Sequence, residues 1–198
     1  MKMPEDEPKN LRAPLIERNV RPWNSYWYWR DKQSGSMGSP VKCSVRLGMK
    51  VANLVSRPQN QDPPDCEGIL DGWSGIEITE LVHRPTLKRS IKAVKARAAG
   101  RQPEKSEAYY VWDRRDYLAT VQQQIDDKDA ATIKGGPYDR YVLVIHTGEF
   151  FLNRMTVNQF LQGARFSARL IITDVLVGLS YEPGFGLPTF ALDLTRSS

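Results

Sequence analysis

Hydrophobic and polar residues alternate most clearly between Pro64 and Glu80. Two runs that resemble β-strands lie on either side of an Asp71-Gly72 pair. Such runs are typical of β-strands, and an Asp-Gly pair between them is a strong signal for a tight hairpin turn. The pattern therefore predicts a two-stranded antiparallel hairpin in this stretch.

Two turn lengths fit this hairpin, and they give two different registers. A two-residue turn formed by Asp71-Gly72 places Asp65 opposite Ile78. A three-residue turn, which begins at Leu70, places Asp65 opposite Glu77 instead. Because side chains alternate between the two faces of a strand, the register decides which residues share a face.

The distribution of polar side chains favours the three-residue turn, because that register separates carboxylates from apolar groups. One face then holds Asp65, Glu67, Glu77 and Thr79 with Ile69 and Trp73, and the other holds Cys66, Gly68, Leu70, Ile76 and Ile78. The two-residue turn would mix two of the carboxylates with the isoleucines. Directly opposed carboxylates repel each other unless a cation lies between them, and Mg²⁺ is the hard cation that such pairs typically bind.

Periodicity along the rest of the chain predicts further helices and strands. In chain order these are a helix from Pro85 to Ala99, a short strand at Tyr109–Trp112, a helix from Asp113 to about Ile133, a strand at Arg140–Thr147, a helix near Thr156–Gly163, and strands at Asp174–Tyr181 and Thr189–Leu194. The almost continuously apolar run at Arg140–Thr147 indicates a central strand that is buried on both faces. This order of elements predicts an α/β fold with a mixed sheet flanked by helices.

The N-terminal part of the chain is expected to be an arm rather than part of the domain. Residues 1–40 include a predicted short helix at Leu11–Val20 and a Gly/Ser-rich linker at Gln33–Pro40. The folded domain is expected to span residues 41–198. Apolar residues between Val41 and Val51 alternate as in a strand, but positions 47–55 also fit a helical stripe, so both interpretations stay open.

Three of the five tryptophans lie in the stretch Trp23–Trp29 of this arm. Aromatic rings beside arginines suit stacking on unpaired bases. The same composition suits an arm that packs on the core or on a partner subunit, since aromatic residues dominate burial in cores and interfaces. We favour packing, and we expect a homodimer that forms through this arm.

The chain carries a net charge of +5 and has a pI near 9.2, which indicates a polyanionic partner such as nucleic acid. Basic residues cluster in the helix predicted from Pro85. They include Lys88, Arg89, Lys92, Lys95 and Arg97. Its apolar stripe is expected to be Leu87, Ile91, Val94 and Ala98. Such a helix either lies along phosphates or presents a solvated face, and the sequence supports both interpretations equally.

Composition also argues against several classes of protein. The longest apolar runs are far too short to cross a membrane, and the acidic, polar start does not resemble a signal peptide. Two cysteines without a disulfide framework indicate a reducing compartment, the cytoplasm. Only two histidines are present, which excludes a multi-histidine metal site, and neither a glycine-rich phosphate loop nor a nucleophile elbow occurs. A cysteine–histidine nucleophile pair is disfavoured because small cysteines in strands are usually buried.

The hairpin resembles the active-site motif of the PD-(D/E)xK nucleases, the restriction-endonuclease-like superfamily. Pro64-Asp65 and, after eleven intervening residues, Glu77-Ile78-Thr79 match this motif. The resemblance covers residues 64–82 by motif and about 40–180 by order of elements. It implies that Asp65 and Glu77 bind Mg²⁺ or Mn²⁺ and that the protein hydrolyses phosphodiester bonds, in DNA above all. The register favours Glu67 over Glu80 as an auxiliary ligand, because Glu80 points to the other face.

The sequence departs from this motif at Thr79, where the family has a catalytic lysine. Lys128 is placed to supply the missing charge, because it continues the apolar stripe of the second predicted helix after Ile125. A lysine in such a place either snorkels to the surface or faces an acidic group. We therefore expect Lys128 beside Asp65 or Glu77. The candidate catalytic residues are then Asp65, Glu77, Thr79 at the motif position, and Lys128. The alternative, which Thr79 favours, is a catalytically inactive binding or interaction module with a nuclease fold.

Overall fold

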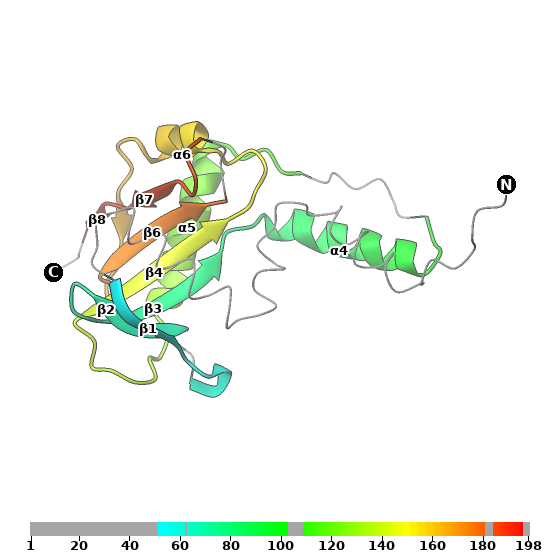
Figure 1. Cartoon of the computed structure of the whole chain (residues 1–198). Helices are drawn as coiled ribbons and strands as arrows, with labels where there is room; N and C mark the ends of the chain where they lie inside the picture. Colours follow the sequence, from blue (N-terminus) through cyan, green and yellow to red (C-terminus); the bar gives the residue numbers. More distant parts are fainter. Residues whose placement is uncertain (1–50, 62, 103–108, 181–183, 196–198) are drawn as a thin grey trace.

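A six-stranded mixed sheet forms the centre of the molecule, with helices packed on one of its faces (Figure 1). The computed structural model describes residues 51–61, 63–102, 109–180 and 184–195. The strands are β1 (Val51–Ser56), β2 (Cys66–Leu70), β3 (Trp73–Glu80), β4 (Arg140–Thr147), β5 (Phe166–Ser167), β6 (Asp174–Leu179), β7 (Thr189–Ala191) and β8 (Leu194–Thr195). The helices are the short 3-10 helix η1 (Gln59–Gln61), α4 (Arg84–Ala98), α5 (Arg114–Asp129) and α6 (Arg154–Leu161).

The strand order in the large sheet is β1-β2-β3-β4-β6-β7 (Figure 1). Strands β1, β2 and β3 are antiparallel, β3, β4 and β6 run parallel, and β7 is antiparallel to β6. The connection from β3 to the parallel strand β4 runs through α4 and α5. The predicted α/β class, the mixed sheet and the central position of the strand at Arg140–Thr147 are therefore confirmed.

The sheet separates two apolar clusters, one on each face. On the first face, α5 packs Tyr117, Val121 and Ile125 against the odd-numbered residues of β4 and β6. On the second face, Cys66 of β2 joins the even-numbered residues of β3 and β4, such as Ile76 and Val142, and Leu176 of β6. Burial on both faces explains why β4 is apolar at nearly every position.

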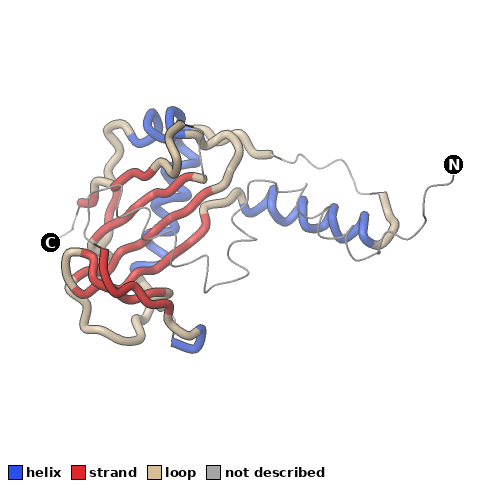
Figure 2. Tube along the Cα trace, in the orientation of Figure 1, coloured by secondary structure: helices blue, strands red, loops and turns tan. Residues whose placement is uncertain are grey.

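Helix α4 projects away from the end of the sheet instead of packing on it (Figures 1 and 2). Its bounds agree with the prediction, and the chain leaves the helix through Gly100, whose positive φ of 71° a glycine adopts easily. The predicted apolar stripe is wrong, because Ile91 is 45% exposed and Ala98 is also exposed, whereas Thr86, Ser90 and Ala93 are buried. A helix that leaves the sheet does not need its apolar residues for the main core.

Several other predicted boundaries are also wrong. No strand forms at Tyr109–Trp112. Helix α5 ends at Asp129 rather than near Ile133, because the Asp129 carboxylate is bound by backbone N–H groups of residues 169–172. The segment predicted as one strand from Thr189 to Leu194 is divided between β7 in the large sheet and β8, which pairs with β5.

The start of the domain is described only from Val51 onward. There β1 is a strand through Ser56, so the helical interpretation of positions 51–55 is wrong. The predicted arm at 1–40, with its helix at Leu11–Val20 and the tryptophan-rich stretch Trp23–Trp29, lies outside the described residues. The expected domain boundary near residue 41 lies outside them as well.

Candidate functional site

The hairpin adopts the three-residue turn, which confirms the predicted register. Ile69 pairs with Trp73, and Cys66 pairs with Ile76. Asp71 and Gly72 in the turn have φ values of 53° and 131°, and the Leu70 N–H donates to the Gly72 carbonyl at 3.0 Å. Positive φ is the conformation that Asp-Gly pairs accept more readily than other residues.

Extension of this register by one residue places Asp65 opposite Glu77. Asp65 lies just before the first residue of β2, and its Oδ2 accepts a hydrogen bond of 2.8 Å from the backbone N–H of Ile78. Glu77 lies in the middle of β3 and is only 5% exposed. Two carboxylate side chains from adjacent strands thus share one face of the sheet, the face on which α5 packs.

Lys128 reaches this pair from α5. Its Nζ donates to Oε1 of Glu77 and forms an ion pair with that carboxylate. One turn earlier in α5, the side chain of Gln124 donates to the backbone carbonyl of Glu80 at 2.9 Å, so α5 runs antiparallel to β3 over the site. The expectation that Lys128 lies beside a hairpin carboxylate is confirmed.

The two members of this ion pair differ in their access to solvent. The side chain of Glu77 is 7% exposed, whereas that of Lys128 is 33% exposed. Lys128 is therefore the member of the pair that solvent, and an incoming anionic group, reaches more easily.

The remaining carboxylates predicted on the hairpin are not part of this group. Glu67 accepts a hydrogen bond of 2.9 Å from Arg57 Nη1 and another from the hydroxyl of Tyr138. By strand alternation Glu80 belongs to the opposite face, as expected, and Thr79 lies on the face of Glu77 but carries no charge. Within the described residues, no group of three or more His, Cys, Asp or Glu side chains could hold a metal ion.

Two tyrosines beside the carboxylates were not predicted as site residues. Burial, together with the hydrogen bond to Glu67, raises the pKa of Tyr138 to about 12. Tyr141 is 2% exposed, and its hydroxyl has no hydrogen-bond partner among the described residues. Burial raises the pKa of Tyr141, and the nearby charges of Glu77 and Asp65 raise it further, so this buried hydroxyl is a neutral donor next to the carboxylate pair.

Gly75 makes room for these two rings. In the sheet it lies between Tyr141 of β4 and Glu67 of β2. A Cβ atom at position 75 would come within 3.1 Å of ring atoms of both Tyr138 and Tyr141. The signal in the sequence was a glycine inside a strand, which often marks a close approach of other groups.

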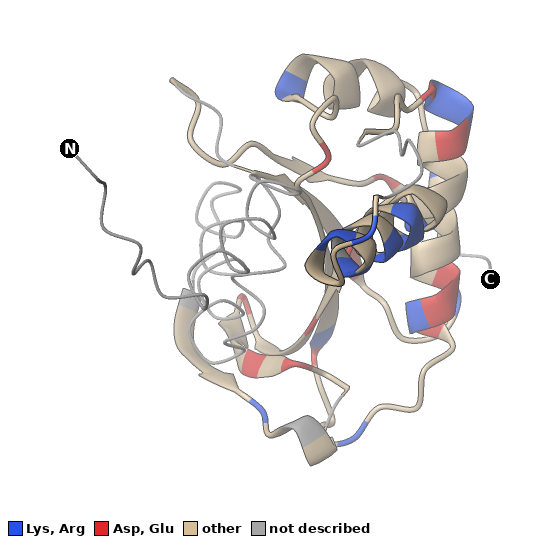
Figure 3. Ribbon diagram, turned by 90° about the vertical axis from the view of Figure 1, so that its right-hand side faces the viewer, with Lys and Arg blue, Asp and Glu red and all other residues tan. Residues whose placement is uncertain are grey.

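The five basic residues predicted to contact nucleic acid are all exposed on α4. Figure 3 looks along this helix and shows basic residues around it and no acidic ones. The helix begins four residues after the end of β3, the strand that holds Glu77. The five residues, Lys88, Arg89, Lys92, Lys95 and Arg97, therefore do not surround the carboxylates but extend from the same end of the sheet.

The described cysteine and both histidines do not form a nucleophilic site. Cys66 is fully buried in the apolar cluster of the second face. His83 stacks on Tyr110 with ring centroids 3.6 Å apart, and burial lowers the pKa of His146 to about 4. These contacts are those of structural side chains.

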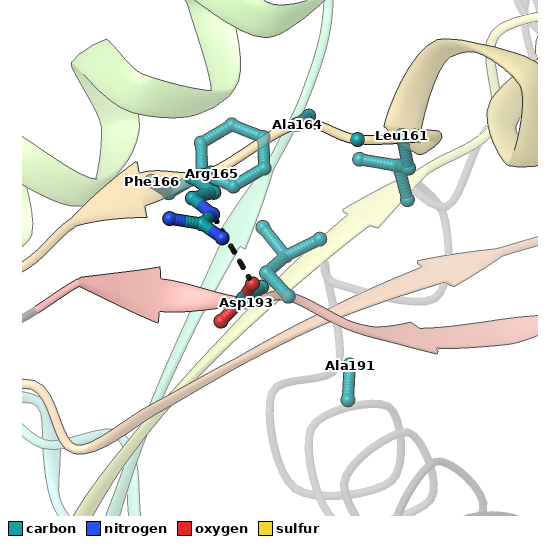
Figure 4. A pocket seen from close by; sticks show the side chains of 8 residues that line it. Leu161, Ala164, Arg165, Phe166, Ala191 and Asp193 are labelled. Carbon is teal, nitrogen blue, oxygen red and sulfur yellow. Dashed lines mark ion pairs between the residues drawn. The ribbon is translucent and has the colours of Figure 1, made fainter.

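A pocket of about 370 Å³ lies near the β7 edge of the sheet, away from the hairpin (Figure 4). Its lining includes Leu161, Phe166 and an exposed ion pair between Arg165 and Asp193, with 3.9 Å between Nε and Oδ2. The pocket contains none of the residues predicted to be functional.

Comparison with protein-family models, curated proteins and solved structures finds no match to this chain. In the described part of the chain, every helix lacks the length or the apolar character needed to cross a membrane.

Proposed function

We propose that this protein is a metal-dependent nuclease that hydrolyses phosphodiester bonds in DNA. The observation that carries the proposal is the contact between the Lys128 ammonium and Glu77, opposite Asp65. Two carboxylates on one face of the hairpin, with an ammonium from α5 beside them, are the side chains that phosphodiester hydrolysis with a divalent metal needs. The cytoplasm remains the proposed location, in keeping with the low cysteine content.

The topology supports a restriction-endonuclease-like core. Three antiparallel strands, β1 to β3, are followed by a helical connection and by β4, which is parallel to β3. The carboxylates lie at the start of β2 and within β3, where the motif of that superfamily has them. Thr79 occupies the position of the motif lysine. Lys128 would supply the missing positive charge from α5 instead of from the hairpin.

The side chains of the site fit Mg²⁺ or Mn²⁺. Asp65 and Glu77 offer the oxygen ligands that these hard cations prefer, and water and substrate phosphate usually complete the coordination. The buried hydroxyl of Tyr141 has no partner among the described residues, so it is available to donate to a water or phosphate oxygen beside the carboxylates. A bound cation would lower the pKa of a water molecule and neutralise charge on the phosphate. Glu67 is held by Arg57 and Tyr138, so we assign it to the support of the site rather than to the metal.

The protein's own side chains have separate roles in this proposal. Lys128 exchanges Glu77 for a phosphate oxygen of the substrate, because its stem is long and its side chain is one-third exposed. Tyr141 donates a hydrogen bond to a water or phosphate oxygen beside the carboxylates. The basic residues of α4 hold the phosphates of the DNA beyond the end of β3 from which α4 projects.

The test is cleavage of supercoiled plasmid by native protein and by Glu77→Ala, each with Mg²⁺ and with EDTA. We expect native protein to nick or linearise the plasmid only with Mg²⁺, and the variant to be at least about 100-fold slower. Equal cleavage by both proteins would identify a contaminant. If neither cleaves plasmid, linear duplex or single strands, the proposal is wrong.

A second candidate is a binding module with a nuclease fold and no catalytic activity. It is favoured by Thr79 at the motif position and by the presence of only two carboxylates at the site, since no described group of three is available. In that case DNA binding would be retained in EDTA, and Glu77→Ala would not change it. Cleavage that depends on both Mg²⁺ and Glu77 separates the two candidates.

A further inference from the structure

Three aromatic rings that the core does not use lie together on the surface. Tyr109 is 48% exposed, Phe150 57% and Phe151 41%. Their ring centroids are 5.1 Å apart for Phe150 and Phe151, and 5.2 Å and 6.2 Å from Tyr109. Large aromatic side chains are costly to leave in water, and a cluster of them marks a site of interaction.

The two phenylalanines are displayed on a loop that is firmly held. This loop joins β4 to α6, and its next residue, Leu152, is buried in the core of the first face. The N–H of Leu152 donates to the Glu149 carbonyl at 3.1 Å, and the N–H of Glu149 donates to Thr147 Oγ1 at 3.2 Å. The rings are therefore exposed by a fixed backbone and do not fold back into the core.

The same loop is joined to the base of the basic helix α4. The carboxylate of Glu149 accepts a hydrogen bond of 3.0 Å from the backbone N–H of His83, the residue that precedes α4. The His83 ring stacks on Tyr110, the neighbour of Tyr109. Figure 1 shows these segments together at the end of the sheet from which α4 projects. The aromatic cluster and the positive helix thus have a fixed relation to each other.

Between Arg84 and Arg101 the chain has seven basic residues and no acidic one. A ligand that covers the rings also meets this charge, so it must combine flat apolar groups with negative charge. Unpaired nucleotides have both, because a base stacks on an aromatic ring while its phosphate contacts a lysine or arginine. In duplex DNA the faces of the bases are not available for stacking on a protein.

We propose that Tyr109, Phe150 and Phe151 form a stacking site for unpaired bases, with α4 as its phosphate-binding partner. This inference rests on the proposed function only in taking nucleic acid as the ligand. The site is distinct from the carboxylate pair. Glu77 is paired with Leu143 of β4, and the length of β4 from Leu143 to its end at Thr147 is about 13 Å. A substrate with a single-stranded tail or a frayed end would occupy both places.

The test is fluorescence anisotropy of a labelled oligothymidylate and of a blunt duplex, both in EDTA so that no hydrolysis occurs. We expect the double variant Phe150→Ala/Phe151→Ala to bind the single strand at least about tenfold more weakly and the duplex with unchanged affinity. Replacement of both residues by tryptophan should restore single-strand binding, because stacking is kept. Leu170→Ala is the matched control, since Leu170 is 73% exposed but lies elsewhere.

Equal affinity of the alanine variant and native protein for the single strand would overturn the proposal. An equal loss on both ligands would also overturn it, because it would indicate damage to α4. Light scattering distinguishes a protein interface: a native dimer that the alanine variant abolishes would assign the rings to a second copy instead. Plasmid cleavage is measured separately, so loss of the proposed nuclease activity leaves this inference standing, and loss of single-strand binding leaves the nuclease standing.

Discussion

Lys128 and Asp129 are neighbours at the C-terminal end of α5, and the structure uses their opposite charges differently. The Lys128 ammonium contacts the side chain of Glu77 on β3. The Asp129 carboxylate turns toward the segment before β6 and accepts hydrogen bonds from four consecutive backbone N–H groups, those of residues 169–172, at 2.5 to 2.9 Å. The charge of Lys128 thus faces a side chain, whereas the charge of Asp129 faces a group of backbone N–H donors, which we call its amide cradle.

The helix itself treats the two residues differently. Its C-terminal end carries partial negative charge, which favours the cation of Lys128 and opposes the anion of Asp129. Burial alone would raise the pKa of Asp129, but the four backbone hydrogen bonds outweigh burial and lower the pKa below its ordinary value of 3.8. Asp129 therefore needs its cradle, whereas Lys128 is tolerated at the helix end without one.

The difference separates a charge in a fixed contact from a charge whose partner can be exchanged. Backbone amides in a fixed segment cannot leave Asp129 without local unfolding, so this contact holds the loop before β6 against α5. Lys128 has a flexible stem and its side chain is one-third exposed, so it can leave Glu77 for another anion without local unfolding. A partly buried charge whose partner can be exchanged is the better indication of a chemical role.

The largest expected effect concerns Lys128→Met, which keeps the stem and removes the charge. We expect cleavage to become about 10²- to 10³-fold slower, because an ammonium that stabilises phosphate charge is lost. Mn²⁺ should bind the site more tightly, since Lys128 no longer competes for Glu77. Activity is measured on plasmid and Mn²⁺ affinity by electron paramagnetic resonance.

Lys134→Met is the control for this variant. Lys134 is exposed in the loop after α5, and its Nζ contacts the backbone carbonyl of Asn60 at 3.3 Å rather than a carboxylate. Lys134→Met should change neither the rate of plasmid cleavage nor the affinity for Mn²⁺. If Lys128→Met lowered cleavage and metal affinity together, Lys128 would be a structural residue like Asp129.

The second effect is on stability, from Asp129→Asn. An asparagine amide would direct N–H donors at backbone N–H donors, so we expect a loss of about 3 kcal/mol. For a chain of this size, that loss lowers Tm by about 6–12 °C. Asp127→Asn is the control, because Asp127 is exposed and its side chain bonds only the side chain of Gln123 among the contacts of the described residues.

The pH dependence of this difference follows from the lowered pKa of Asp129. A carboxyl group with a lowered pKa adds stability that is complete above its ordinary pKa of 3.8 and is lost as pH falls through the folded-state value. Native protein and Asp129→Asn should therefore differ most at neutral pH and converge well below pH 3.8 in thermal unfolding. A constant difference across this range would show that the carboxylate charge is not what holds the loop.

The hairpin and the approach of Lys128 could be predicted because both follow from local periodicity. The two-residue alternation around Asp71-Gly72 permits only one register that keeps carboxylates out of the apolar face, and the 3.6-residue stripe of α5 aims Lys128 at the sheet. Long-range pairings were harder. Glu67 contacts Arg57 and Tyr138, which are distant from it in the sequence. No local pattern around Glu67 predicts these contacts, so the sequence alone favoured Glu67 as a metal ligand.

The end of α5 and the packing of α4 also depend on contacts that are distant in the sequence. The end of α5 is set by a loop forty residues later that binds Asp129, and no pattern near position 129 encodes it. The apolar residues of α4 resemble those of any amphipathic helix, but α4 leaves the sheet, and Ile91 stays in solvent. Local pattern predicts which face a helix could bury, and tertiary contacts decide whether it does.

The smallest expected effect distinguishes two buried tyrosines of the same face. Tyr141 and Tyr117 are each at most 2% exposed, and neither hydroxyl has a hydrogen-bond partner among the described residues. An unpaired buried hydroxyl costs about 1–3 kcal/mol, so Tyr→Phe at either position should leave stability unchanged or raise it. Only Tyr141 lies beside Glu77 and Asp65, whose charges help to raise its pKa. Tyr141→Phe should therefore slow cleavage about tenfold, the worth of one hydrogen bond, while Tyr117→Phe leaves cleavage unchanged. Thermal unfolding and initial rates on plasmid are measured for both variants. If cleavage responds equally in the two, the Tyr141 hydroxyl fills space like that of Tyr117, and the site consists of Asp65, Glu77 and Lys128 alone.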